Sequence, residues 1–283
     1  MDIEQDALIP GELIYYAHSL SSRFKELLLP PTSDVHYDNP LHSAPHLRRH
    51  IKFIKDTPNA FTFLNGDLIE AVTKQSKGDI HRQTKTSQEQ AEDILDILFP
   101  IKHKILGITM GNHEKRVYDE VGDDWCRYLA KGLGVPYRAA GMLLKISFGS
   151  GNDGHPEKPY VYWIYFTHGY GGARTKSAKA VKVERTATWI HADAYVMSHD
   201  HVVNAAPDIY LLPDNRTHRE VCKSKETGFI IGKMAAHRKV LVKSNAFLKW
   251  GGYSEMGGFP PVDLETPLIK LSGKGKRRVT VEV

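Results

Sequence analysis

Residues 105–114 of the chain read ILGITMGNHE. The first six are mostly apolar or β-branched and are followed at once by a glycine, so the stretch predicts a strand that ends in a tight turn. The turn carries an amide, an imidazole and a carboxylate, the side chains of Asn112, His113 and Glu114. Such oxygen and nitrogen atoms are ligands for manganese, iron and zinc. The stretch therefore indicates a strand that brings polar side chains to one edge of a sheet.

The same arrangement recurs in four other places, where a polar turn follows an apolar run. The four are Asp34-Val35-His36, Gly66-Asp67, Thr167-His168-Gly169 and Ser198-His199-Asp200-His201. Residues two apart in extended backbone point to the same side, so both ends of Asp-x-His or His-x-His can face one cation. In open α/β sheets, ligands bind outside the carboxyl ends of the strands. Each segment alone is a weak signal, but all five in this order predict a single site.

The five segments, in order, read D-x-H, GD, GNH[DE], H and SHDH in place of GHxH, and in this the chain resembles the calcineurin-like metallophosphoesterases. The matching region runs from Asp34 to His201. The resemblance implies an α/β fold of two packed mixed β-sheets flanked by helices, a four-layer α/β/β/α sandwich. It also implies two divalent metal ions, with manganese expected first and iron, zinc or nickel as alternatives.

The resemblance also implies a role for each motif residue. One ion would be held by Asp34, His36, Asp67 and His201, and the other by Asp67, Asn112, His168 and His199, so that Asp67 bridges the two. His113 would not bind metal but would lie beside the scissile phosphate, as the catalytic histidine.

Phosphate esters are anionic and repel hydroxide, so their hydrolysis needs a cationic clamp and a nucleophile formed at neutral pH. Two ions about 3.5–4 Å apart lower the pKa of a bridging water and bind the phosphate oxygens. A protonated His113 could then stabilise the leaving oxygen or donate a proton to it. We therefore expect a two-metal phosphoester hydrolase, a phosphodiesterase that acts on nucleotides or nucleic acid through a metal-bridging hydroxide.

Two departures from the motif series narrow this expectation. Residues 68–71 read LIEA, not the Asp-Arg-Gly of the protein Ser/Thr phosphatases, and so resemble the phosphodiesterase and DNA-repair nuclease branch. Ser198 replaces a glycine, and we expect a small backbone adjustment there without loss of ligands. A phosphomonoesterase on the same site and an inactive scaffold remain alternatives, although all seven ligands and His113 are present.

Substrate contacts are expected from the loop after His168. Arg174, Lys176 and Lys179 follow Gly171 and Gly172 and are the candidates for binding the anionic phosphoester, whether nucleic acid or nucleotide. The aromatic and glycine-rich residues 250–261 are a candidate rim over the cleft, for stacking on a base.

The composition and the spacing of the motifs limit the kind of metal site, the number of domains and the location of the protein. The chain has 283 residues, a net charge of +5, 15 histidines and only two cysteines, so metal chemistry would use imidazole and carboxylate. Ligands spread from Asp34 to His201 must meet in one cleft, which favours a single domain over 1–283, with a core of about 25–205 and C-terminal strands and the rim in 206–283. The longest apolar run has seven residues, too short for a membrane span, and the acidic start lacks a secretory signal pattern. We therefore expect a cytoplasmic protein without a membrane partner.

Periodicity predicts the elements between the motifs. Residues from about 11 are expected to form a helix that leads into a strand at 27–29. Further helices are expected at 46–55, 89–98, 123–132 and 175–191, and strands at 60–64, 105–110, 143–148, 160–167, 194–197, 228–234, 239–242, 268–271 and 279–283. His42, His46 and His50 recur every four residues, which places them on one face of a helix, and we expect that face to be exposed or to lie at the edge of the core, since no carboxylates are clustered with them.

Overall fold

The computed structural model describes residues 14–74, 76, 80–214, 222–223, 230–244, 246–256, 258, 261 and 263–283. The strands are β1 (Tyr16–Ser19), β2 (Glu26–Leu29), β3 (Thr62–Asn65), β4 (Ile105–Thr109), β5 (Tyr137–Arg138), β6 (Met142–Phe148), β7 (Tyr160–Thr167), β8 (Ala194–Met197), β9 (Asn204–Pro213), β10 (Cys222–Lys223), β11 (Ile230–Ile231), β12 (Met234–Lys243), β13 (Leu268–Ser272) and β14 (Val279–Glu282). The helices are α1 (Ala44–Asp56), α2 (Ser87–Leu98), α3 (Asn112–Val121), α4 (Trp125–Leu133), α5 (Lys176–Thr186) and α6 (Tyr253–Met256), with 3₁₀ turns η2 (Ile80–Arg82), η3 (Phe99–Lys104) and η4 (Asn152–Gly154).

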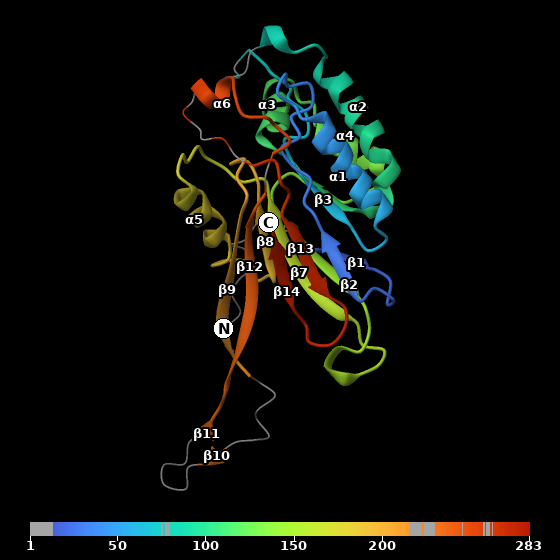
Figure 1. Ribbon diagram of the computed structural model, residues 1–283, viewed down its shortest axis with the longest axis vertical. Helices are drawn as coiled ribbons and strands as arrows, with labels where there is room; N and C mark the ends of the chain where they lie inside the picture. Colours follow the sequence, from blue (N-terminus) through green and yellow to red (C-terminus); the bar gives the residue numbers. More distant parts are fainter. Residues whose placement is uncertain are drawn as a thin grey trace.

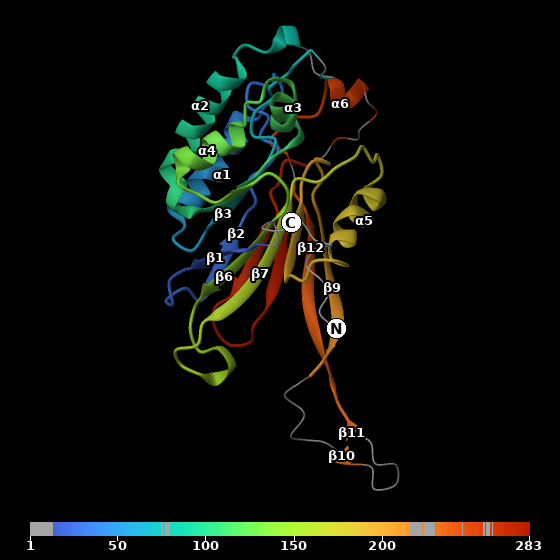
Figure 2. The same cartoon turned by 180° about the vertical axis from the view of Figure 1, so that it is seen from behind.

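The larger sheet has six strands in the order β1-β6-β7-β8-β12-β9. The central strands β7, β8 and β12 run parallel, whereas β6 pairs antiparallel with β7 and β9 pairs antiparallel with β12. The far ends of β9 and β12 project from the body of the molecule as a two-stranded arm, seen from both sides in Figures 1 and 2. The sheet is therefore mixed, as expected.

The second sheet is made of two three-stranded parts, β14-β13-β2 and β3-β4-β5. Isolated bridges between Leu28 and Ala60 and between Thr32 and Leu64 join β2 to β3. β3, β4 and β5 run parallel, while β13 pairs antiparallel with both β2 and β14. The last strands of the chain thus complete the sheet that carries the first motifs.

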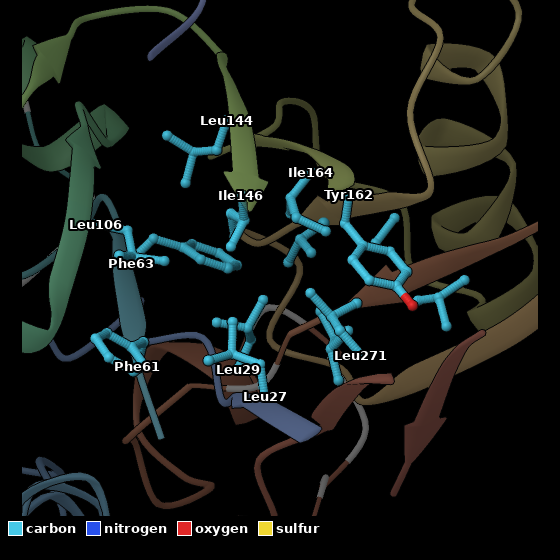
Figure 3. Packing of buried hydrophobic residues seen from close by; sticks show 14 of the residues in the cluster. Leu27, Leu29, Phe61, Phe63, Leu106, Leu144, Ile146, Tyr162, Ile164 and Leu271 are labelled. Atoms are coloured by element: carbon cyan, nitrogen blue, oxygen red, sulfur yellow. The ribbon is translucent and has the colours of Figure 1, made fainter. Parts of the chain in front are cut away.

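The main core lies between the two sheets. Alternate residues of β6, from Met142 to Phe148, are buried, and those between them are partly exposed. The buried ones meet Leu27, Leu29 and Phe63 from the opposite sheet, as Figure 3 shows for Leu144, Ile146 and Phe63. Face-to-face packing of two sheets explains the alternation along β6 and β13, whereas β3 and β4 are buried at every position because helices cover their outer side.

Helices cover the outer face of each sheet. α1, α2 and α4 pack on the β3-β4-β5 part through a second apolar cluster that includes Ile54, Ile94 and Leu129. α5 covers β8 and β12 on the other side, through Val183 against Tyr195 and Leu241. Figures 1 and 2 show the two groups of helices on opposite sides of the sheets. The predicted four-layer α/β/β/α architecture is confirmed.

One predicted helix is wrong. The described part of the segment from about residue 11 to residue 26 holds the strand β1, which pairs parallel with β6. Leu13, Tyr16, Leu20 and Phe24 stand at near-helical spacing, but the last three of these positions are even and fit the two-residue period of a strand equally well. Tyr16 and His18 are partly buried while Ala17 and Ser19 are exposed, because only one face of β1 meets the core. Elements that the sequence did not predict include the helices α3 and α6 and the strands β5 and β9.

Candidate metal centre

The five polar segments meet at one edge of the two sheets. Asp67, Asn112, His168 and His199 follow the ends of β3, β4, β7 and β8, and Asp34 follows β2. β3 runs parallel to β4, and β7 runs parallel to β8, so within each pair the carboxyl ends point the same way. Hydrogen bonds from the backbone N–H of Asp34 to the carbonyl of Gly66 and of His36 to that of Asp67 hold the first two loops together.

Within the described residues, three sets of side chains offer ligand atoms that all lie within 4.8 Å of one another. The sets are Asp34, His36 and His201; His36, Asp67 and His113; and Asp67, His168 and His199. His36 and Asp67 each belong to two sets, so the sets form one continuous cluster. The structure therefore brings together the seven predicted ligands and His113, with Asn112 joined to the cluster by the contacts given below.

The first half of the cluster centres on His201. Its Nε2 lies 3.1 Å from Oδ1 of Asp34 and 3.1 Å from Nε2 of His36, and Nε2 of His36 lies 3.8 Å from Oδ2 of Asp67. The second half centres on Asn112, whose Oδ1 lies 3.0 Å from Nε2 of His168 and 2.6 Å from Nδ1 of His199. Nε2 of His168 is also 3.1 Å from Oδ2 of Asp67.

Four of these six separations, at 3.0 or 3.1 Å, suit a shared cation. Two ligands bound at about 2.1 Å to one ion stand roughly 3.0–3.4 Å apart at angles between octahedral and tetrahedral. Two imidazole nitrogens at 3.1 Å, as in His36 and His201, can both point their lone pairs at such an ion. The donors are imidazole nitrogen, carboxylate oxygen and amide oxygen, a set that suits divalent manganese, iron or zinc. The residues present fit two divalent ions.

The imidazoles are oriented by hydrogen bonds from their other ring nitrogen. Nδ1 of His36 donates to Oε2 of Glu70 at 2.9 Å, and Nδ1 of His168 donates to the carbonyl of Asn65 at 2.8 Å. Nε2 of His199 donates to the carbonyl of Gly171 at 2.7 Å. Metal-binding histidines commonly use the second nitrogen in this way, which fixes the tautomer and the ring direction. The sequence assigns no role to Glu70 or Asn65, because no pattern marks which carboxylate or backbone carbonyl faces an imidazole ring.

The loops hold unusual backbone conformations. Asp34, His36, Asp67, His199 and His201 all have φ between 47° and 69°, the left-handed region that residues with a side chain rarely adopt. Strain of this kind costs about 1–3 kcal/mol per residue and persists where the surroundings enforce it. Its concentration on five predicted ligands marks the loops as the functional part of the fold.

Gly66 and Gly111 allow two of these loops to touch. A Cβ at Gly66 would stand 2.4 Å from the nitrogen of Gly111, and one at Gly111 would stand 2.1 Å from the nitrogen of Asp67. Gly66 also has φ +76°, whereas Gly111 is extended, so its glycine is needed for close approach and not for a turn conformation. Ser198, at the place of a glycine, is buried, and its hydroxyl accepts a hydrogen bond from Asn65 at 2.6 Å.

Charge in the cluster favours bound cations. Burial alone would lower the pKa of His168, but the carboxylates of Asp67 and Asp34 raise it to about 10. Burial opposes ionisation of Asp67, yet the neighbouring His168 and His113 hold its pKa well below the usual value. The pKa of Glu70 falls to about 2, against the effect of burial, because His36 lies beside it. The buried carboxylates are therefore ionised and attract positive charge.

His113 stands at the start of α3, next to the bridging position. Its backbone N–H donates to Oδ1 of Asp67 at 2.9 Å, and its Nδ1 donates to the carbonyl of Glu70 at 2.5 Å. Its ring lies edge-on to that of His36, with 4.6 Å between centroids, and its side chain is 17% exposed. The ring is thus held firmly beside the cluster while part of it faces solvent.

The structure separates the predicted substrate contacts. Lys179 is buried and donates to the carbonyl of Asp200 at 2.8 Å, so it is not available to a substrate. Arg174 and Lys176 are exposed, and the Nη1 atom of Arg174 would be 3.7 Å from a Cβ at Gly258. Trp250 of the predicted rim is 44% exposed, but Gly257, Phe259 and Pro260 lie outside the described residues. Their roles in binding substrate stay predictions.

His42, His46 and His50 lie at the edge of the core, as expected. The rings of His46 and His50 pack against Phe247, and Nε2 of His50 is bonded to the hydroxyl of Thr32 at 2.7 Å. Nδ1 of His42 donates to the carbonyl of Val35 at 2.8 Å. The three side chains support the Asp34–His36 loop through their contacts with Val35, Thr32 and Phe247, whose backbone N–H donates to the carbonyl of Asp34.

No protein-family model and no curated protein matches the chain. Solved structures with a similar fold include calcineurin-like phosphoesterase YfkN from Bacillus subtilis, at 14% identity and a TM-score of 0.44 over 91% of this chain and 90% of that one. They also include the phosphoesterase Yfce from E. coli, at 13% identity and 0.38 over 87% and 88%, and nuclease MPE from Pseudomonas putida, at 11% identity and 0.35 over 90% and 87%.

In its five motif segments, the chain resembles the calcineurin-like phosphoesterases. These solved structures have low sequence identity and low TM-scores to the chain. The residues of the candidate metal centre therefore indicate its function. Across the part of the chain that the structure describes, no helix has the length and apolar character to cross a bilayer.

Proposed function

We propose that this chain is a metal-dependent phosphoester hydrolase, and specifically a phosphodiesterase acting on nucleotides or nucleic acid. The observation that carries the proposal is the position of Asp67. Its Oδ2 lies 3.1 Å from Nε2 of His168 in one half of the cluster and 3.8 Å from Nε2 of His36 in the other. A single buried carboxylate shared by two sets of ligands is the arrangement that a pair of ions needs.

The ligands of one ion would be Asp34, His36, Asp67 and His201, and those of the other Asp67, Asn112, His168 and His199. When bound, two divalent ions supply an acidified water and a positive clamp on the phosphate oxygens. The two aspartates cancel only two of the four positive charges, which leaves the site attractive to an anionic substrate. Manganese is the ion we propose first, because the ligands are nitrogen and oxygen without thiolate.

His113 would act on the leaving group. Because Nδ1 donates to the carbonyl of Glu70, the other ring nitrogen, Nε2, is available to a substrate. A protonated imidazole there can stabilise a developing alkoxide or donate the proton that it needs. Arg174 and Lys176, both exposed, would bind phosphates further along the substrate. The absence of the Asp-Arg-Gly sequence after Gly66 supports a diester over a phosphoprotein.

The test is hydrolysis by protein stripped of metal and reloaded with Mn²⁺. Substrates are bis-(p-nitrophenyl) phosphate, p-nitrophenyl phosphate, cyclic nucleotides, single-stranded DNA and duplex DNA. We expect diester hydrolysis that requires metal and is abolished by Asp67→Ala, with Asp96→Ala, an exposed residue of α2, as the matched control. Metal analysis of the protein as purified identifies the ion.

Each contrary result removes a definite part of the proposal. Activity that survives Asp67→Ala excludes the two-metal site. A monoester rate well above the diester rate assigns a phosphomonoesterase, and metal binding without turnover of any of these substrates assigns a scaffold. Hydrolysis of small diesters without cleavage of DNA or cyclic nucleotides excludes the nucleic-acid or nucleotide substrate.

A further inference from the structure

A buried group of charges lies behind the last motif. Asp200 stands between His199 and His201, and its side chain is 2% exposed. Its Oδ1 lies 2.7 Å from Nζ of Lys182 on α5, and its Oδ2 lies 2.6 Å from Nζ of Lys243 on β12. No motif of the resemblance requires an acid at this position or a lysine at the other two.

The lysines also bind the backbone of the same turn. Lys243, which is completely buried at the end of β12, donates to the carbonyl of Ser198 at 2.8 Å. Lys179 of α5 donates to the carbonyl of Asp200 at 2.8 Å. A buried ammonium group is costly to desolvate unless it is paired, so three lysines converging on two residues, Ser198 and Asp200, are a built arrangement and not a solvated surface.

Asp200 faces away from the metal ligands. It meets α5 and β12, whereas Nδ1 of His199 meets Asn112 and Nε2 of His201 meets Asp34. The two histidines flanking it have φ of 69° and 49°, a strained conformation that relaxes unless the turn is fixed. Ion pairs to α5 and β12 thus fix the turn on one side, while both imidazoles point to the other side, towards Asn112 and Asp34.

Lys182 also lies near Gly171, whose carbonyl orients the ring of His199. Its Nζ lies beside Gly171, where an added Cβ would come within 3.5 Å of it. The carbonyl of Gly171 accepts the hydrogen bond from Nε2 of His199 at 2.7 Å. Lys182 therefore pairs with the turn that carries His199 and lies near the loop that orients its ring.

We propose that Asp200 is a positioning residue which, held by Lys182 and Lys243, keeps the imidazoles of His199 and His201 in place to bind the metal ions. The inference rests on the proposed metal centre and deepens it, by assigning its geometry to α5 and β12 as well as to the ligands. Outer residues that orient ligands typically change metal affinity or activity about 10- to 100-fold when they are replaced.

The test compares Asp200→Asn, Lys182→Met and Lys182→Arg with a matched control, Lys239→Met. Lys239 lies on the same strand as Lys243 and pairs with Asp208 at 3.1 Å, at a distance from the motif loops. The readouts are Mn²⁺ affinity by titration calorimetry, the visible absorption of the Co²⁺-loaded protein, and the melting temperature in EDTA. None of these requires turnover, and Lys182→Met keeps the test available if Asp200→Asn does not fold.

We expect Asp200→Asn and Lys182→Met to bind Mn²⁺ at least about tenfold more weakly and to alter the Co²⁺ spectrum, with Lys182→Arg restoring the affinity. Lys239→Met should bind metal as the parent does. Affinity within twofold of the parent in folded Asp200→Asn or Lys182→Met, or an equal loss in Lys239→Met, overturns the inference while the metal centre stands. A parent protein that binds no metal overturns both proposals.

Discussion

The carboxylate of Glu114 accepts a hydrogen bond from the backbone N–H of Asp67, with 3.0 Å between Oε2 and the nitrogen. The same carboxylate accepts from the backbone of Leu68 at 2.6 Å and of Gly111 at 3.1 Å. One side chain at the start of α3 thus fixes the loop after β3, and it places the shared carboxylate of the candidate metal centre. Glu114, a motif residue to which no ligand role is assigned, therefore supports the ligand Asp67.

Replacing Glu114 should destabilise the protein strongly. In Glu114→Ala the backbone N–H groups of Asp67, Leu68 and Gly111 lose their acceptor in a buried place, and we expect a loss of about 3 kcal/mol or more in the free energy of unfolding. Urea denaturation in EDTA measures it. Glu92→Ala, at an exposed position on α2, should change stability by less than about 0.5 kcal/mol. Similar losses in both variants would contradict the assigned role.

Glu70 should control metal affinity through His36. Glu70→Gln removes the charge that accepts from Nδ1 of His36, so the ring loses its fixed tautomer and some of its basicity. We expect Mn²⁺ affinity to fall about 10- to 100-fold by calorimetric titration. The control is Asp93→Asn on α2, which breaks the ion pair between Asp93 and Lys85 and should leave the affinity unchanged.

His113 should matter for turnover and little for metal content. In His113→Asn the proton donor for the leaving group is lost while the seven ligands stay, so kcat should fall about 10²- to 10⁴-fold. The metal content by elemental analysis should match that of the parent. An activated leaving group such as p-nitrophenolate needs less protonation, so its rate should fall less than the rate on a nucleotide diester.

Metal removal should destabilise the folded chain. The ionised Asp34 and Asp67 lie together with strained loops, and a bound cation compensates both. At a metal concentration about 100 times the dissociation constant, one site adds about 2.7 kcal/mol, which corresponds to a melting temperature about 5 °C higher or more. Scanning calorimetry with EDTA and then with excess Mn²⁺ measures the shift, and Asp67→Ala should show little of it.

His50 should make the metal-free protein sensitive to acid. Burial lowers the pKa of His50 to about 3 in the fold, while the unfolded chain has the ordinary value near 6.5. Between these values the unfolded state binds more protons, so stability is complete above pH 6.5 and falls as the pH drops towards 3.

From pH 7 to pH 5 this group alone should remove about 2 kcal/mol from the free energy of unfolding. His50→Gln, which still offers Thr32 an acceptor, should therefore lose about 2 kcal/mol less than the parent over this interval. His103→Gln, at an exposed position, should follow the parent. An equal loss in all three proteins would assign the acid sensitivity to other groups.

The order of polar turns after apolar runs was enough to predict which residues meet at one sheet edge, whereas the four-layer α/β/β/α architecture was implied by the resemblance to a known family. This works because strand ends are local events: a β-rich run such as 105–110 followed by glycine makes a strand and a turn almost wherever it stands. The segment around Tyr16 forms a strand although Leu13, Tyr16, Leu20 and Phe24 stand at near-helical spacing, because its pairing with β6 outweighs the local pattern.

What the sequence determined by itself is which side chains serve as candidate ligands, since motif spacing and residue chemistry are properties of the chain. What only the tertiary structure decided is what supports them. Glu70, Glu114 and Asp200 gain their roles from contacts with residues up to 47 positions away along the chain. Carboxylates are common everywhere in a sequence, and their partners become neighbours only when α3, α5 and β12 pack behind the loops.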